Sequence, residues 1–162
     1  MSFVTEHLER RGVAFEAIPH RQTYTSIDEA RALGIDASEV VKTLAVRTAS
    51  GHSLLVIPAP RRLDMRLVRE AVDDQHARLA TEDELRRDFA ACELGALPPL
   101  GSLLGAHVYV DPEVLQHDTV VFAAGSQSES VKIRTADLFN REQVTATALT
   151  RQPERGNEDS IR

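Results

Sequence analysis

The sequence predicts one α/β domain of the α+β type, on three observations. The chain has 162 residues, 42% of them hydrophobic, and a fold of this length buries about 70% of its extended-chain surface. Two β-branched apolar runs, Val40–Val46 and Ser53–Pro58, flank a tight turn at Ser50-Gly51. This pattern indicates an antiparallel hairpin in the middle of a sheet. Short helical patterns alternate with further strand-like runs along the rest of the chain.

The remaining elements are predicted from apolar spacing and from the residues that begin or end them. Ser26 and Glu29 have the spacing of a capping box, as have Thr81 and Glu84, so each pair is expected to begin a helix. The predicted helices are 5–11, which Gly12 ends, 26–34, 63–72, 81–88 and 136–139, and the predicted strands are 13–18, 39–47, 53–58, 106–110, 119–124 and 130–134.

The net charge has the wrong sign for a protein that grips nucleic acid through a broad basic face. Twenty-five acidic residues against 19 basic ones give a formal charge of −6. The helix at 63–72 is expected to carry a basic stripe, Arg62, Arg66 and Arg69, on its outer side. Such a stripe is more often a solvated helix face than a binding surface, so contact with RNA is expected to be local and weak.

Common catalytic motifs are missing from the sequence: there is no nucleophile elbow, no phosphate-binding loop, no His-Glu-x-x-His and no dinucleotide fingerprint. The six histidines are scattered without the spacing of metal ligands. Cys92 is the only cysteine, which excludes an internal disulfide and suits a reducing compartment. We therefore expect no metal ion and no other cofactor.

Lys42 is the first of three features that suggest a polar site. It lies inside an apolar strand, where an unpaired ammonium is costly to desolvate, so it must reach a sheet edge or a polar cleft. A lysine on the wet face of the hairpin is an equally good explanation of Lys42 alone. Only Lys42 and Lys132 are lysines among the 19 basic residues, and an ammonium has an adjustable pKa that a guanidinium lacks.

Two glycine-containing loops are the other features. The segment Leu94–Gly101 is too rich in glycine and proline for a regular element, and its backbone could approach a ligand closely. Gly125 and Ser126 directly follow a strand and could offer donors to an anion or a ribose. Taken alone, the first loop is more often a structural crossing and the second a hairpin turn.

Together and in this order, three stretches resemble a known family. They are Val40-Val41-Lys42-Thr43-Leu44, Gly95-Ala96-Leu97-Pro98-Pro99-Leu100-Gly101, and Phe122-Ala123-Ala124-Gly125-Ser126 leading to Val131-Lys132-Ile133. The chain resembles the YbaK-like, or EbsC-like, aminoacyl-tRNA deacylases, which are related to the editing domain of bacterial prolyl-tRNA synthetases. The resemblance covers roughly residues 13–139. It implies a mixed, mainly antiparallel sheet, curved into a partial barrel, with helices around it.

The resemblance also implies the residues of the site. Lys42 matches the essential lysine of the family, and Gly95 with Pro99 matches its Gly-x-x-x-Pro loop, whose N–H groups up to Gly101 are expected to act with the lysine. The expected substrate-binding residues are Tyr24, Thr25, Thr43, Gly125 and Ser126.

The expected reaction is hydrolysis of the ester that joins a wrong amino acid to the terminal adenosine of tRNA, by a trans-acting deacylase. Lys42 would offset the charge that develops on oxygen. Thr43 after Lys42 is similar to relatives that clear cysteine from proline tRNA, whereas relatives that clear alanine have asparagine there. Two alternatives stay open: a non-catalytic module that binds aminoacyl-tRNA or an amino-acid analogue, and a protein-interaction domain.

The expected partners are the aminoacyl-tRNA acceptor end and a synthetase or an elongation factor. The sequence has no signal-like start and no run of about 20 apolar residues, so no membrane contact is expected and the cytoplasm is the expected location. Residues 1–149 are expected to form the domain. Residues 150–162 are polar and nearly patternless, which predicts a flexible tail.

Overall fold

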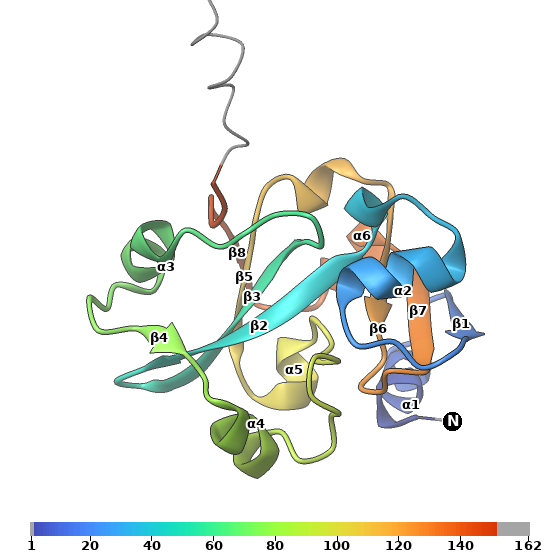
Figure 1. Ribbon diagram of the computed structural model, residues 1–162, viewed down its shortest axis with the longest axis horizontal. Coiled ribbons are helices and arrows are strands. Elements are labelled where there is room, and N and C mark those ends of the chain that lie inside the picture. Colours follow the sequence, from blue (N-terminus) through green and yellow to red (C-terminus); the bar gives the residue numbers. More distant parts are fainter. Residues whose placement is uncertain (1, 152–162) are drawn as a thin grey trace, which may run out of the picture.

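The predicted hairpin forms the centre of the larger of two sheets (Figure 1). In the computed structural model, which describes residues 2–151, β2 (Val41–Thr48) and β3 (Gly51–Pro58) pair antiparallel along their whole length. The sheet has the order β4-β2-β3-β5-β8, in which β5 (His107–Val110) is parallel to β3 and β8 (Val144–Ala146) is parallel to β5. The position of the hairpin in mid-sheet is confirmed.

The smaller sheet has three antiparallel strands in the order β1-β7-β6, namely Phe15–Pro19, Glu129–Arg134 and Thr119–Ala123. A single parallel bridge between Val40 and Val121 connects it to the larger sheet. The expected mixed, mainly antiparallel sheet is therefore confirmed in its pairing. It is divided into two sheets, however, and they do not close into a barrel.

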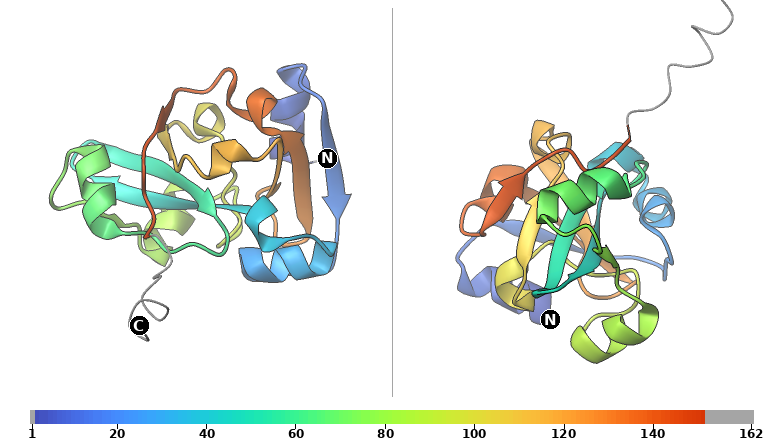
Figure 2. Two further views of the ribbon diagram at one scale, coloured as in Figure 1. Left: turned by 90° about the horizontal axis from the view of Figure 1, so that it is seen from above. Right: turned by 90° about the vertical axis from the view of Figure 1, so that its left-hand side faces the viewer.

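Helices cover both sheets (Figure 2). α1 and α2 lie at the end of the molecule that holds the smaller sheet, and α3 and α4 lie at the opposite end (Figures 1 and 2). No helix within residues 2–151 is long and apolar enough to span a membrane. The helices are α1 (Phe3–Arg10), α2 (Ser26–Leu33), η1 (Ala37–Glu39), α3 (Met65–Val72), α4 (Glu82–Asp88), α5 (Gly101–Leu104), η2 (Val114–Gln116) and α6 (Thr135–Phe139).

The helix caps confirm some of the predictions made from local sequence and contradict another. The capping box of Thr81 and Glu84 is present at α4, and Gly34 ends α2 with φ of 67°. At the start of α2 the prediction is wrong: Thr25, not Ser26, caps the helix by accepting from the N–H of Asp28. Glu29 does not reach back to the cap, because its carboxyl group is buried against β7 and bonded to Ser130.

Two short strands and one short helix were not predicted. β4 (Arg78–Leu79) and β8 have two and three residues, too few for a periodic pattern, and they exist through pairing with β2 and β5. α5 begins at Gly101, inside the segment that was expected to be irregular.

The two faces of β2 belong to different parts of the core. Val41 and Ala45 pack in the largest apolar cluster, together with Leu97 and Leu100. The alternate residues Leu44 and Val46 pack in a second cluster beneath α3. Because side chains alternate along a strand, this assigns Lys42 to the α3 side of β2 and Thr43 to the other side.

The predicted tail begins too early. Thr150 is buried and forms an antiparallel bridge with Leu63. Its hydroxyl donates to the carboxylate of Asp111 at 3.2 Å. The N–H of Arg151 donates to the carbonyl of Arg62. Polar composition suggested a free segment, but these polar groups have partners in the fold. The rest of the predicted tail, 152–162, lies outside the described residues.

Replacing Asp111 should detach this last ordered segment. The buried carboxylate accepts from the N–H of Leu149, from the hydroxyl of Thr150 and from the N–H of Glu113. Asp111→Ala should lower the free energy of unfolding by about 2–4 kcal/mol, because buried groups lose a charged partner. Urea unfolding measures this. Asp118→Ala, whose exposed side chain makes no hydrogen bond within residues 2–151, should change it by less than about 0.5 kcal/mol.

Candidate functional site

The segment from Leu94 to Leu100 is a shaped loop, as its composition predicted. Gly95 has φ of 78°, a conformation that favours glycine, and it is exposed. From Ala96 to Leu100 every residue is buried, including Pro98 and Pro99. The two buried prolines therefore restrict the backbone conformation of the loop, and the Gly95 end of the loop faces solvent.

The loop holds backbone donors that the fold leaves unused. Within residues 2–151, the N–H groups of Gly95, Leu97 and Leu100 donate no hydrogen bond. Pro98 and Pro99 carry no N–H at all. Leu97 and Leu100 are buried, so of these three it is the exposed N–H of Gly95 that a negatively charged or carbonyl oxygen can reach.

The β6–β7 turn clamps this loop. The N–H of Gly125 donates to Ala96 at 3.0 Å, and the N–H of Glu93 donates to the carbonyl of Gly125 at 2.9 Å. The N–H of Gln127 donates to the carboxylate of Glu93 at 3.2 Å, and its buried side-chain amide donates to the carbonyl of Leu94. Sequence reasoning missed Glu93 and Gln127. The only available signal was that Gln127 directly follows the Gly125-Ser126 pair.

A third segment, residues 20–25, completes the arrangement. The N–H of Thr23 donates to the carbonyl of Gln127 at 2.8 Å, and the N–H of His20 donates to Ser128 at 3.0 Å. Gly95 is so close to this segment that a Cβ there would lie 3.4 Å from the carbonyl oxygen of Tyr24. The Tyr24 side chain is 71% exposed. The structure thus brings together Tyr24, Gly95 and the 125–128 turn.

Several predicted donors of the site have other partners. The N–H and C=O of Gly125 are both bonded to the loop, and a Cβ there would lie 2.8 Å from the ring of Phe3. The hydroxyl of Ser126 accepts from the N–H of Ser128. Thr25 uses its hydroxyl as the α2 cap. These contacts explain the identities of the three residues without a ligand, which their sequence positions did not reveal.

The packing around residue 101 also explains why this residue is a glycine. A Cβ at Gly101 would lie 2.2 Å from the carbonyl oxygen of Ala106 and 2.8 Å from a methyl group of Val108. The residue is buried, and its carbonyl accepts from the N–H groups of Gly105 and Ala106. Glycine is therefore required at the start of α5, where the chain packs against Ala106 and Val108, whether or not a ligand binds nearby.

Thr43 lies at a gap in the edge of the larger sheet. β4 pairs with β2 only at Val46 and Arg47, and the bridge to the smaller sheet is at Val40. The carbonyl of Ala45 accepts from Ala80, on the side away from β3. Since carbonyls two residues apart point the same way, the Thr43 carbonyl faces this edge, where no described strand pairs with it. The buried Thr43 hydroxyl also has no partner within residues 2–151.

Lys42 is a half-buried ammonium without an acidic partner. Burial lowers its pKa, and the positive charge of Arg62 lowers it further. No carboxylate oxygen among residues 2–151 lies within 4.0 Å of it. A partly desolvated cation of this kind is suited to an anionic ligand group.

The structure does not join Lys42 directly to the loop. No hydrogen bond within residues 2–151 connects Lys42 with Gly95 or with Ser126, and strand alternation places the Lys42 side chain on the α3 side of β2. Thr43 shares the other side with Val41 and Ala45, whose cluster includes the loop residue Leu97. Lys42 and Thr43 therefore flank the edge gap from opposite faces.

Cys92 and metal ions offer no alternative chemistry within the described residues. Burial raises the pKa of the Cys92 thiol to about 11, so it is not a thiolate nucleophile near neutral pH. The cavity beside it, lined by Phe89, Leu94 and Gly95 among others, is about 10 Å³, room for a single water molecule. Among residues 2–151 no group of three or more His, Cys, Asp and Glu side chains could hold a metal ion.

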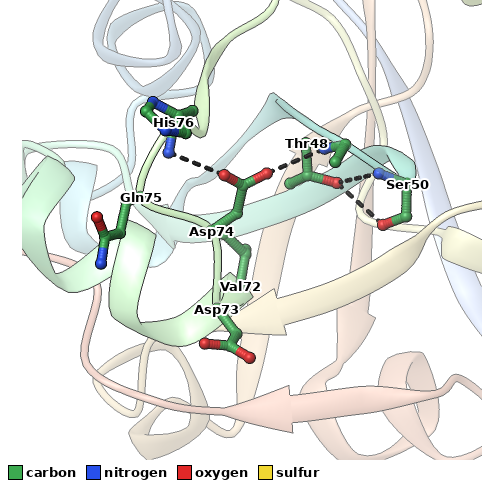
Figure 3. Close-up of a pocket in the computed structure, with 8 residues that line it drawn as sticks. Thr48, Ser50, Val72, Asp73, Asp74, Gln75 and His76 are labelled. Atoms are coloured by element: carbon green, nitrogen blue, oxygen red, sulfur yellow. Dashed lines mark hydrogen bonds between the residues drawn. The ribbon is translucent and has the colours of Figure 1, made fainter.

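A larger, open pocket of about 550 Å³ lies elsewhere, between the β2–β3 turn and the end of α3 (Figure 3). Its central carboxylate, Asp74, accepts from the N–H groups of Ala49 and His76 and so ties the two segments together. Thr48 in its wall is six residues from Lys42 along β2, which is about 20 Å. Asp74 and Thr48 are engaged in hydrogen bonds of the fold, and the pocket lies far from Lys42, so we do not assign it to the candidate site.

Comparisons with known proteins agree on one relationship. Residues 20–140 match the family described as an aminoacyl-tRNA editing domain. A proline–tRNA ligase of Fervidobacterium nodosum is 31% identical over 77 residues, which are 48% of this chain and span 13% of that ligase.

Solved structures share the fold. One described as a candidate trans-editing enzyme for prolyl tRNA synthetase has a TM-score of 0.81 and 23% identity over 94% of this chain and 99% of its own. A hypothetical protein has a TM-score of 0.83 and 24% identity over 91% and 99%.

A methyl group at Gly95 should disturb the clamp. A Cβ there would lie 2.8 Å from Nε2 of Gln127, which must then leave the Leu94 carbonyl. Gly95→Ala should therefore lower the free energy of unfolding by about 1 kcal/mol more than Gly105→Ala does. Gly105 has φ of 69° with open space around it and so serves as the control for backbone strain alone.

A double-mutant cycle makes the test specific. In a Gln127→Ala background the obstacle is gone, and the effects of Gly95→Ala and Gly105→Ala on urea unfolding should become equal. A Gly95→Ala effect that is unchanged in that background would contradict the proposed contact.

Proposed function

Because the chain belongs to the family of aminoacyl-tRNA editing domains, we propose that it is a deacylase that hydrolyses the ester bond of a mischarged tRNA. One observation carries the proposal: Lys42 is a half-buried ammonium with no acidic partner among the described residues. It lies beside a sheet-edge gap whose other side holds the hydroxyl of Thr43, which has no partner within residues 2–151. Such a gap suits a compact ligand with an anionic end.

In the proposed reaction, a nucleophile attacks the ester carbonyl carbon, and the bond to the ribose oxygen breaks as that oxygen takes the proton that the nucleophile loses. The nucleophile is water or a group of the substrate. Negative charge develops on the carbonyl oxygen, and the exposed N–H of Gly95, which donates to no group within residues 2–151, stabilises it. Lys42 reaches the same oxygen or the neighbouring phosphate through the edge gap, from the opposite face of β2. Tyr24, exposed beside the loop, offers a ring on which the terminal adenine can stack.

We propose a small amino acid as the group removed, with cysteine on proline tRNA as the first substrate to test. Two comparisons support this choice: the relative that is a proline–tRNA ligase and the fold neighbour described for prolyl tRNA synthetase. Trans-acting use of the domain, with a synthetase or an elongation factor delivering the tRNA, fits the formal charge of −6.

Lys42→Ala should lower the single-turnover deacylation rate by about 100-fold or more, the effect of losing one oxyanion donor. Lys42→Arg should also be slow, because a planar guanidinium is bulkier than the ammonium and occupies the place of the substrate oxygen. The rates are measured on whichever mischarged tRNA the wild type hydrolyses, with thermal unfolding as a check of the fold.

Lys132 is the matched control for Lys42. It is the only other lysine and lies exposed on β7. Lys132→Ala should leave the rate within about twofold of wild type. A near-wild-type rate for Lys42→Ala would remove Lys42 from the mechanism and favour a binding module instead.

The basic stripe should provide the main electrostatic contact with tRNA. Arg62, Arg66 and Arg69 are all exposed. Arg66→Ala should weaken tRNA binding and reduce the slope of log K against log salt by about 1, the effect of one lost phosphate contact. Filter binding over a salt series measures the slope. Arg86→Ala, at another exposed arginine on α4, should leave it unchanged, and equal effects of the two variants would argue against a local contact.

A further inference from the structure

A network of three polar side chains, two of them buried and one partly exposed, lies behind the segment that carries Tyr24. Glu29 of α2 is 2% exposed, and Ser130 of β7 is fully buried. The hydroxyl of Ser130 is bonded to the carboxyl group of Glu29 and lies 2.8 Å from Nε2 of His20. Nδ1 of His20 lies 2.6 Å from the carbonyl oxygen of Arg21. The mechanism proposed above uses none of these groups.

The contacts of this network can all be satisfied only if the network holds one proton more than its separate groups would carry at neutral pH. A carbonyl oxygen only accepts, so Nδ1 of His20 carries a proton. Ser130 has a single hydroxyl proton, which can satisfy either His20 or Glu29 but not both. All contacts are satisfied only when a second donor is present: either Glu29 is protonated and donates to Ser130, or His20 is doubly protonated.

The network is placed to hold both ends of the 20–25 segment. His20 follows β1 directly, and Glu29 belongs to the first turns of α2, whose cap is Thr25. Ser130 fixes both of them to β7. Between these points, Thr23 binds the carbonyl of Gln127 through its N–H and its hydroxyl.

We propose that Glu29, Ser130 and His20 form a proton-sharing latch that positions the Tyr24 segment beside the Gly95 loop. The role in substrate positioning rests on the proposed deacylase function, whereas the latch itself does not. Its members are positioning residues, since they act through the segment and do not reach the reacting atoms.

The latch should loosen as the pH rises through neutrality. Burial raises the pKa of Glu29 to about 7, against a smaller opposing effect of the Ser130 hydrogen bond. Above that pH the Ser130 hydroxyl donates its hydrogen bond to the Glu29 carboxylate, and Nε2 of His20 loses its donor. Because the folded-state pKa lies above the ordinary value of 4.5, the contribution of Glu29 to stability is complete below about pH 4.5 and is lost as the pH rises to about 7.

Other charged groups around Glu29 do not replace this proton. No charged side chain within residues 2–151 forms a hydrogen bond or ion pair with Glu29, and Arg21 pairs with Asp28 instead. The charged residues of the surrounding elements are Glu16 on β1, Glu129, Lys132 and Arg134 on β7, Arg21, Asp28 and Arg31 in and before α2, and Asp36 and Glu39 at η1.

Limited trypsin digestion of the full chain tests the latch without substrate. Arg21 is exposed, so the rate of cleavage after Arg21, followed by mass, reports opening of the segment. In Glu29→Gln the amide donates to Ser130 at every pH. The ratio of wild-type to Glu29→Gln cleavage should rise about fivefold from pH 6 to pH 8, the effect of one lost hydrogen bond. Using the ratio cancels the pH dependence of trypsin itself.

Ser130 variants give the second arm. Ser130→Ala should raise cleavage after Arg21 about fivefold at pH 6, and Ser130→Thr, which keeps a hydroxyl, should restore it. On a hydrolysed mischarged tRNA, Ser130→Ala should raise KM about fivefold with kcat within twofold. A constant cleavage ratio between pH 6 and 8, or wild-type cleavage in Ser130→Ala, would overturn the latch. If no mischarged tRNA is hydrolysed by the wild type, the proposed function fails, while the cleavage results still decide the latch.

Discussion

The clamp between the 93–97 segment and the β6–β7 turn is the constraint on which the candidate site depends. Two backbone hydrogen bonds through Gly125 join the loop to the smaller sheet, and the buried amide of Gln127 closes the contact. Without them, the loop would be tied to the fold mainly through its apolar side chains. The same turn holds Thr23, so one feature fixes both the loop amides and the segment that presents Tyr24.

The fold was largely predictable because its signals are local. Two β-branched apolar runs around a tight turn indicated the hairpin, and the Thr81 box began α4 as expected. The failures have a common cause, which is competition from distant partners. Glu29 had the spacing of a capping residue, but a hydroxyl on β7 binds it instead. Thr150 looked like a solvated tail residue, yet Asp111 holds it in place.

The sequence could select candidate members of the site, but not their geometry. Motif order selected Lys42 and Gly95, and the structure gives both of them chemically useful surroundings. The sequence could not show which side of the sheet edge Lys42 and Thr43 each face, because that depends on which cluster packs against each face of β2. Nor could it show that the donors of Gly125 and Ser126 have intramolecular partners. Their glycine and serine identities are explained by close packing and by a local turn.

The short length of the gap at Thr43 also disfavours self-association of the protein. A free sheet edge usually invites another chain to add a strand, which leads to aggregation. Here β4 covers one end of the β2 edge and the Val40–Val121 bridge covers the other, so the opening is shorter than an ordinary strand. An incoming polypeptide would find too few partners to dock in register. Polar groups on a compact ligand can still use the opening, and the protein thereby keeps unpaired backbone for recognition without exposing a self-association surface.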